Sequence, residues 1–319
     1  MTTIGYHASH EQLPPRDLLS AVRLAESVGF DAAMCSDHLA PWTPAQGQSG
    51  FAWTWLGAAL ASTRFPLGIV TAPGQRYHPV ILAQAIATVE LMFHGRFWAA
   101  LGSGEAINEH ITGTAWPEKI YREQRLHECV DTIRRLLAGE KVTIDSTIRV
   151  DEARVWSRPE SPPPLLGAAV SAKTAEWVAG WADGLITVGS DPSATGAALS
   201  AFRDAGGRGE AILQVHVSLA DTDEEALRVA RAQWNHSTAP AELMWDIQQP
   251  EEFEALADPT AEKLNGAAII SASADEVADR VASAAAGFDQ VYIHHVGVDQ
   301  GPFLRRCEEQ LLPALRRLM

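Results

Sequence analysis

Short apolar runs recur along the chain, and a longer segment with helical spacing follows most of them. The runs are too short for helices and have Gly, Pro or Asp near their ends, as buried strands do. Eight runs are predicted to be strands: Thr3–Tyr6, Asp31–Cys35, Leu67–Thr71, Phe97–Leu101, Leu165–Val170, Gly184–Val188, Ala211–Val217 and Gln290–His295.

Helical patterns lie between these strands. Pro14–Ser27 opens with prolines, keeps Leu18 and Val22 on one face, and stops at Gly29, which suits a helix C-cap. The other predicted helices are Pro79–Phe93, Glu123–Leu137, Ala172–Ala182, Glu224–His236, Asp275–Ala286 and Pro302–Leu318. Two capping boxes mark helix starts, at Thr222 with Glu225 and at Ser273 with Glu276.

The alternation of strands and helices predicts an α/β fold with a parallel sheet, and eight units predict a closed (β/α)8 TIM barrel whose site lies at the strand C-termini. A doubly wound open sheet is the alternative, but it usually carries a glycine-rich fingerprint where this chain has Tyr6–His10. We expect one domain over residues 1–319, with insertions at about 141–164 and 236–268. The first should form a strand pair, and the second a lid or binding loop.

Charge and cysteine content narrow the function classes. The chain has 25 Lys and Arg against 40 Asp and Glu, a net charge of −15, which argues against binding to nucleic acids or anionic membranes. Its three cysteines form no CxxC pair, which argues against a structural zinc and fits reduced thiols. Neither a signal-peptide pattern nor an apolar run of roughly 20 residues is present, so a cytoplasmic protein is expected.

Two clusters of polar residues follow predicted strands and are therefore expected at the barrel mouth. Asp37, His38 and Trp42 follow the second strand, where a histidine can exchange protons near neutral pH. Glu105 and Asn108 follow the fourth strand in a glycine-containing segment. Glu105 and His38 facing one pocket would form an acid/base pair, whereas either cluster alone is also compatible with ordinary loop and capping roles.

Three further segments carry weaker signals. Ala169–Lys173 spans the end of the fifth strand and a helix start, which suits either an anion site or a plain serine N-cap. Arg76 follows the third strand and can bind an anion or pair with a carboxylate. His294 and His295 end the last strand, but neighbouring residues on a strand point to opposite faces, so a two-histidine metal site is not expected.

Taken together, these blocks resemble the luciferase-like flavin and deazaflavin oxidoreductases, and the most similar branch is the deazaflavin-dependent glucose-6-phosphate dehydrogenases. The resemblance runs over nearly the whole chain. Its most specific blocks are Ser36–His38 with Pro41–Trp42, and Gly102–Ala106 with Asn108–Glu109. It implies a bacterial-luciferase-like barrel and a homodimer.

The resemblance also implies roles for individual residues. His38, Glu105 and Trp42 would be catalytic, with His38 next to the substrate as base or hydrogen-bond partner and Glu105 as an acid near the ring. A cis peptide around Ile69–Val70 would back the ring. The implied cofactor-binding residues are Asp37, Val70, Thr71, Ser103, Gly104, Asn108, Ala169, Val170, Ser171, Ala172 and Lys173. The expected substrate-binding residues are Trp42, Val188, Met244 and Trp245, and no metal is expected.

The chain departs from that branch at the positions that hold the sugar phosphate. There it has Val188, Asp191, Met244 and Ala267, which cannot bind a phosphate in the same way. These departures predict a small uncharged or weakly polar substrate and not glucose 6-phosphate.

The expected cofactor is FMN, with the deazaflavin coenzyme F420 as the alternative. A hydroxyl at Ser171 and an ammonium at Lys173 favour the phosphate dianion of FMN over a phosphodiester. The function is then a monooxygenase, with a flavin reductase as electron source, or a hydride-transferring dehydrogenase or reductase. A non-catalytic flavin-binding protein and a metal-dependent barrel hydrolase are further alternatives.

Overall fold

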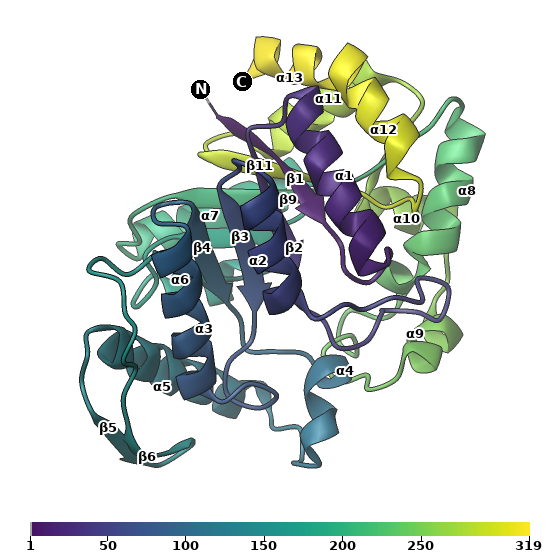
Figure 1. Ribbon diagram of the computed structural model, residues 1–319. Coiled ribbons are helices and arrows are strands. Elements are labelled where there is room, and N and C mark those ends of the chain that lie inside the picture. The colour runs from purple at the N-terminus through teal and green to yellow at the C-terminus, as the bar shows by residue number, and fades with distance from the viewer. Residues whose placement is uncertain (1) are drawn as a thin grey trace.

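The computed structural model describes residues 2–319, and it forms the predicted (β/α)8 barrel (Figure 1). Eight parallel strands close the barrel because β8 pairs with β9 as well as with β7. The barrel strands are β1 (Thr3–Ala8), β2 (Ala32–Ser36), β3 (Leu67–Thr71), β4 (Phe97–Leu101), β7 (Leu165–Ala168), β8 (Leu185–Val188), β9 (Ala211–Leu219) and β11 (Gln290–His295).

Helices surround the barrel and cover its strands, as Figure 1 shows. The helices are α1 (Pro15–Val28), α2 (Ala52–Ser62), α3 (Pro79–Met92), α4 (Ala106–Glu109), α5 (Lys119–Leu137), α6 (Ala172–Val178), α7 (Pro192–Asp204), α8 (Asp223–Gln233), α9 (Pro250–Leu256), α10 (Ala261–Ala267), α11 (Ala274–Ala284), α12 (Gln300–Arg306) and α13 (Leu312–Leu318). The predicted capping boxes are present, since Thr222 and Ser273 accept hydrogen bonds from the Glu225 and Glu276 amides.

Both predicted insertions contain secondary structure. The strand pair predicted within residues 141–164 is the antiparallel hairpin of β5 (Val142–Asp145) and β6 (Arg149–Ala153). Residues 236–268 hold α9 and α10, and they lead into the short strand β10 (Ile269–Ser271), which pairs with the end of β9.

Large aromatic side chains fill the lower part of the barrel, which leaves the cavity at the C-terminal mouth. Trp98 of β4 and Tyr292 of β11 meet edge to face inside it, with ring centroids 5.9 Å apart. Their space depends on two glycines, because a Cβ on Gly68 would lie 2.0 Å from the Trp98 ring, and one on Gly5 would lie 2.3 Å from the Tyr292 ring. Glycine is therefore required at both positions.

Several element predictions were wrong in detail. The fifth barrel strand ends at Ala168 rather than Val170, because Ser171 already caps α6. The C-terminal helix is interrupted by a π-helical segment, Cys307–Leu311, just before Pro313, which lacks the N–H that a continuous α-helix would need.

Candidate functional site

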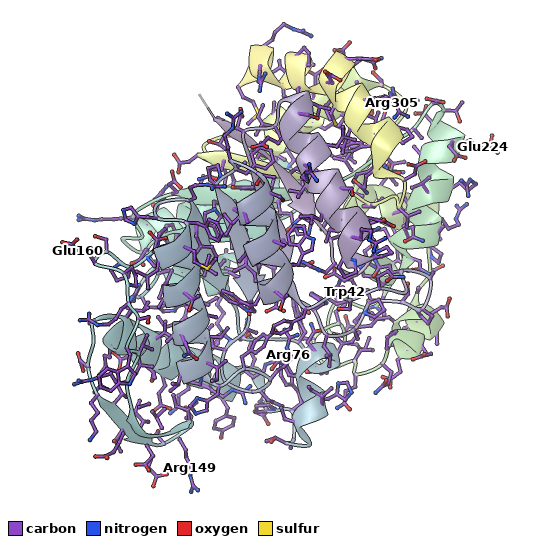
Figure 2. All side chains as sticks on the ribbon, in the orientation of Figure 1. Trp42, Arg76, Arg149, Glu160, Glu224 and Arg305 are labelled. Carbon is purple, nitrogen blue, oxygen red and sulfur yellow. The ribbon has the colours of Figure 1, made fainter. Side chains whose placement is uncertain are left out.

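A cavity of about 500 Å³ opens at the C-terminal mouth of the barrel. That volume lies within the range of small-molecule and cofactor pockets. In Figure 2, Trp42 and Arg76 lie within the body of the molecule near this mouth, whereas Arg149, Glu160, Glu224 and Arg305 lie on the periphery.

Most of the predicted site residues converge on this cavity. Its wall contains Asp37, His38, Trp42, Val70, Thr71, Ser103, Gly104, Glu105, Asn108, Ala169, Val170, Val188, Met244 and Trp245. Ser171, Ala172 and Lys173 are exposed and lie outside the cavity wall. The loops after β2, β3, β4 and β7 therefore share one pocket, as the barrel topology predicts.

His38 lies between two carboxylates. Its Nε2 is 3.5 Å from an oxygen of Glu105 and 3.5 Å from an oxygen of Glu11, a residue of the loop that follows β1. Glu11 is held in place by hydrogen bonds from the hydroxyls of Ser9 and Ser36. The three side chains form an acid–imidazole–acid group, and all three line the cavity.

Asn108 sets the orientation of this group. Its Oδ1 accepts a hydrogen bond from the Leu39 amide at 2.8 Å, so its Nδ2 is the atom that faces Glu105 at 3.1 Å and His38 Nδ1 at 3.3 Å. Nδ2 is a donor, so Nδ1 of a neutral His38 must accept. The proton of the neutral ring is then on Nε2, which faces both carboxylates and the cavity.

The two carboxylates differ in their pKa. Burial raises the pKa of Glu105, and the negative charge of Glu11 raises it further. The charges of His38 and Arg76 and the hydrogen bond from Asn108 lower it, but they do not cancel the rise. For Glu11, burial alone would raise the pKa, but the charge of His38 and the Ser9 hydrogen bond help to lower it to about 2. Glu11 therefore stays anionic, and Glu105 is the carboxylate that can take up a proton closer to neutral pH.

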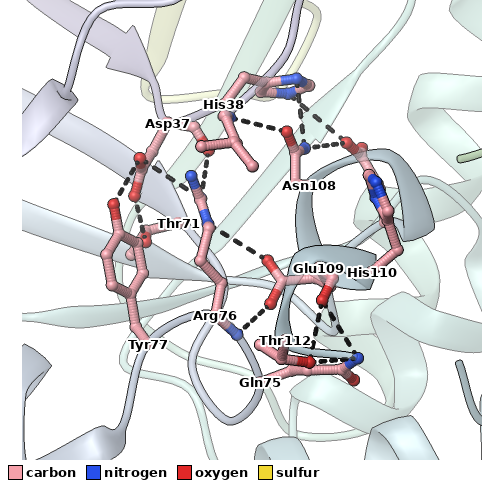
Figure 3. A network of polar contacts seen from close by, with 12 residues as sticks. Asp37, His38, Thr71, Gln75, Arg76, Tyr77, Asn108, Glu109, His110 and Thr112 are labelled. Atoms are coloured by element: carbon pink, nitrogen blue, oxygen red, sulfur yellow. Dashed lines mark hydrogen bonds and ion pairs between the residues drawn. The ribbon is translucent and has the colours of Figure 1, made fainter. Parts of the chain in front are cut away.

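A second polar network crosses the cavity wall and is drawn in Figure 3. Asp37 accepts hydrogen bonds from Thr71 Oγ1 at 2.7 Å and from the Tyr77 hydroxyl at 3.1 Å. Arg76 lies between Asp37 and Glu109, at 3.4 and 3.5 Å from their carboxylates. Of the two roles considered for Arg76, the structure has the carboxylate pair.

Aromatic rings form the wall next to His38. The ring centroid of Trp42 is 4.8 Å from that of His38. On its other neighbour, His236, Trp42 stacks with nearly parallel planes and a centroid distance of 5.1 Å. His236 in turn contacts Trp234 at 4.4 Å. Residues 236–268 thus contribute directly to the pocket, and the Trp245 carbonyl ties them to α4 by accepting from the Ala106 amide at 3.0 Å.

The structure differs from the expected cofactor site at two places. Ser171 uses its hydroxyl to cap α6 at the Thr174 amide, and Lys173 is exposed beyond the cavity wall. Every peptide bond described for residues 2–319 is trans, including those around Ile69–Val70, where β3 pairs regularly with β2 and β4.

Of the four residues that replace the sugar-phosphate ligands of the related branch, three lie in the cavity wall and one does not. Val188, Met244 and Ala267 line the cavity. Asp191 does not, because its carboxylate caps α7 by accepting from the Ser193 amide at 3.0 Å.

Sequence reasoning missed several polar groups of the cavity, among them Glu11, His216, His236, Lys119 and Arg122. The two cations come from the first turns of α5 and lie near Thr174, whose hydroxyl accepts from Lys119 Nζ at 3.0 Å. The side chain of Arg122 is 7% exposed; its Nη1 forms an ion pair with the exposed Asp246 at 3.5 Å, and its Nε has no hydrogen-bond partner. The only signal in the sequence was a helix that begins with basic residues after a loop. Without the fold, that signal does not show that these residues reach the cavity.

Within residues 2–319, no group of three or more His, Cys, Asp or Glu side chains could hold a metal ion. In the same part of the chain, no helix is both long and apolar enough to cross a membrane.

The fold and site together define a luciferase-like barrel oxidoreductase with a flavin-type cofactor pocket. The chain belongs to the luciferase-like monooxygenase family, whose family model matches residues 1–290. It is 38% identical over 331 residues to an F420-dependent glucose-6-phosphate dehydrogenase of Beutenbergia cavernae, covering 99% of this chain and 98% of that protein. A protein of the same name from Microbacterium testaceum is 37% identical, covering 98% of this chain and 97% of that protein.

A solved structure is similar over the whole chain. An F420-dependent secondary alcohol dehydrogenase in complex with an F420–acetone adduct superposes with a TM-score of 0.89 at 28% identity, covering 99% of both chains.

These findings overturn the predicted function. The sequence favoured an FMN-dependent enzyme for a small uncharged substrate other than glucose 6-phosphate, whereas the relatives are named F420-dependent dehydrogenases, and glucose 6-phosphate is in their name. The FMN preference depended on Ser171 and Lys173, which are exposed and do not line the cavity.

Proposed function

We propose that the chain is a dehydrogenase that uses the deazaflavin coenzyme F420 to oxidise an alcohol carbon of a small molecule to a carbonyl. The observation that carries the proposal is the Glu11–His38–Glu105 group at the mouth of the barrel. The names of the relatives and of the solved structure support it.

The residues present fit this coenzyme, which carries a phosphodiester and an acidic tail. Lys119 and Arg122 lie in the cavity wall, and the buried Arg122 pairs with Asp246 at 3.5 Å but leaves its Nε without an acceptor. Ala169, Val170 and Thr174 offer backbone and hydroxyl groups at the same end of the pocket. Asp37, Val70 and Thr71 would line the ring from β2 and β3.

When bound, the coenzyme supplies a central ring that accepts a hydride and reacts poorly with oxygen. The chain has to orient the alcohol and to take its hydroxyl proton. His38 Nε2–H is positioned to donate a hydrogen bond to the substrate oxygen, which is the hydrogen-bond role predicted for it. Glu105, with its raised pKa, is the acceptor for the proton, and the anionic Glu11, 3.5 Å from His38 Nε2, helps to orient the Nε2–H bond.

Trp42 and His236 cover the other side of the reacting centre. Their stacked rings are apolar on their faces and would exclude water from the substrate carbon. Val188, Met244 and Trp245 extend this surface and would contact the remainder of the substrate.

The test is an anaerobic assay of the purified protein with oxidised F420 and a set of alcohols that includes glucose 6-phosphate and propan-2-ol. The expected result is loss of the deazaflavin absorbance with at least one alcohol, matched mole for mole by a carbonyl product. The proposal is wrong if every alcohol fails while FMN-loaded protein consumes oxygen.

A further inference from the structure

A histidine on the far wall of the cavity has no part in the chemistry described above. His216 lies on β9, and its half-buried ring lines the cavity. It contacts His294 of β11 through a hydrogen bond of 2.8 Å between the two Nδ1 atoms. His294 in turn contacts Gln12, in the loop after β1, at 2.7 Å.

Each hydrogen bond in this series can have only one donor. The Gln12 amide nitrogen donates to the Val296 carbonyl, and a carbonyl can only accept, so the Gln12 oxygen is the atom that faces His294. That oxygen also only accepts, so His294 must carry its proton on Nε2. Its Nδ1 is then a lone pair, provided that the ring is neutral.

The neutral state of both rings follows from burial. His294 is 2% exposed, and burial lowers its pKa well below the ordinary value, with the neighbouring histidines adding to the effect. Burial likewise lowers the pKa of His216 to about 3, helped by the charges of His7 and His236.

The ring nitrogen of His216 that carries the proton can be assigned in the same way. Since His294 Nδ1 accepts, His216 Nδ1 must donate, and a neutral imidazole has only one N–H. His216 Nε2 is thus a lone pair, and none of the described residues donates a hydrogen bond to it. An acceptor of this kind in a cavity wall is costly to leave unpaired in a complex, so it selects ligands with a donor.

The position of His216 identifies which part of a ligand it meets. In the strand order of the closed barrel, β9 stands opposite β3, and Val70 and Thr71 are predicted to line the coenzyme ring from β3. His216 therefore lies across the cavity from these residues, on the side left for the substrate if the coenzyme ring lies against β3. It is separated from His38 by a row of rings, Trp234, His236 and Trp42, with successive centroids 4.4 to 5.1 Å apart.

We propose that His216 Nε2 accepts a hydrogen bond from a substrate hydroxyl other than the one being oxidised. The substrate is then a polyhydroxy compound, such as a sugar or polyol, and His216 is a specificity-determining residue. Gln12 and His294 are positioning residues, because they act by fixing the tautomer of His216. This inference rests on the proposed alcohol dehydrogenase function.

The kinetic test compares matched substrates on wild type, His216→Phe and His295→Phe. His295 is the control because it neighbours His294 on the same strand but stacks on Phe303 outside the cavity. The substrates are glucose 6-phosphate, cyclohexane-1,2-diol and cyclohexanol, with F420 affinity measured separately by fluorescence.

The expected result is a roughly 5- to 100-fold loss of kcat/KM for the polyhydroxy substrates in His216→Phe, with little change for cyclohexanol or for F420 affinity. The control should match wild type. Equal losses on all substrates together with weaker F420 binding would place the donor on the coenzyme and overturn the inference, and so would unchanged kinetics. If wild type oxidises no alcohol with F420, the proposed function fails first.

The tautomer is measurable without turnover. Nitrogen-15 NMR of histidine-labelled protein, assigned by the signals that His216→Phe removes, should show His216 protonated on Nδ1 and bare on Nε2. Gln12→Met should abolish that preference. A wild-type His216 protonated on Nε2 contradicts the inference whether or not any variant folds poorly.

Discussion

At the scale of single residues, the site depends on Asn108. Its side-chain amide contacts three groups that follow β2 and β4: it accepts from the Leu39 N–H and donates to His38 and Glu105. The side chain is 4% exposed, so little water competes for these bonds. Asn108 was predicted to line the cofactor, and it does line the cavity, but its contacts also make it a positioning residue.

The first prediction concerns Glu105, the proposed proton acceptor. Glu105→Gln should lower kcat by roughly 10²–10⁴. The carboxyl must be ionised to accept, and its pKa is raised, so wild-type kcat/KM should fall with decreasing pH at a value above that of an ordinary glutamate. The variant should lose this acidic limb.

Rate measurements across pH check this prediction, with Glu118→Gln as the control because that carboxyl is exposed outside the cavity. Unchanged F420 affinity would exclude a binding defect. An acidic limb that persists unaltered in Glu105→Gln would assign the titration to another group.

His38, Glu105 and Asn108 could be predicted because each directly follows a strand of the barrel, where topology alone brings side chains together. Glu11 could not, since nothing in its local sequence distinguishes it from a loop carboxylate. The tautomer of His216 is further out of reach, because it depends on Gln12 and His294, which are 282 residues apart in sequence.

At the scale of elements, Arg76 joins the loops that follow β2, β3 and β4. Its side chain is 7% exposed, and those of Asp37 and Glu109 are 0% and 2% exposed, so three charges are buried together. Removing the cation leaves two carboxylates close together without a counter-charge, which is far more costly than losing an exposed ion pair.

Arg76→Met should therefore lower the free energy of unfolding by about 3–5 kcal/mol. Urea unfolding followed by circular dichroism measures it. Arg135→Met is the matched control, because Arg135 pairs with Glu140 at the surface, and it should leave the unfolding midpoint unchanged. Equal midpoints for the two variants would mean that the buried network adds no stability.

The strands were easier to predict than the helices. Buried parallel strands are continuous apolar runs, and all eight were found close to their observed bounds. Helix α2 was missed because its sequence, rich in Ala, Leu and Trp, lacks a polar face, and β10 was missed because it has only three residues. Both owe their structure to packing against the rest of the barrel, which no local pattern contains.

At the scale of the whole molecule, the class of enzyme was predictable and the choice of cofactor was not. The order of the sequence blocks identified the family correctly. The FMN preference depended on Ser171 and Lys173, which are exposed and do not line the cavity, whereas Lys119 and Arg122, some 50 residues earlier, do. In a chain with a net charge of −15, these two cations give the cavity wall positive charge, which supports the proposed binding of an anionic coenzyme.

The most direct test of the account is a fluorescence titration of the purified protein with F420 and, separately, with FMN. We expect saturable binding of one F420 per chain, with FMN at least roughly 10-fold weaker, since Lys119 and Arg122 are proposed to bind the longer anionic tail. Binding of FMN that equals or exceeds that of F420 would contradict it.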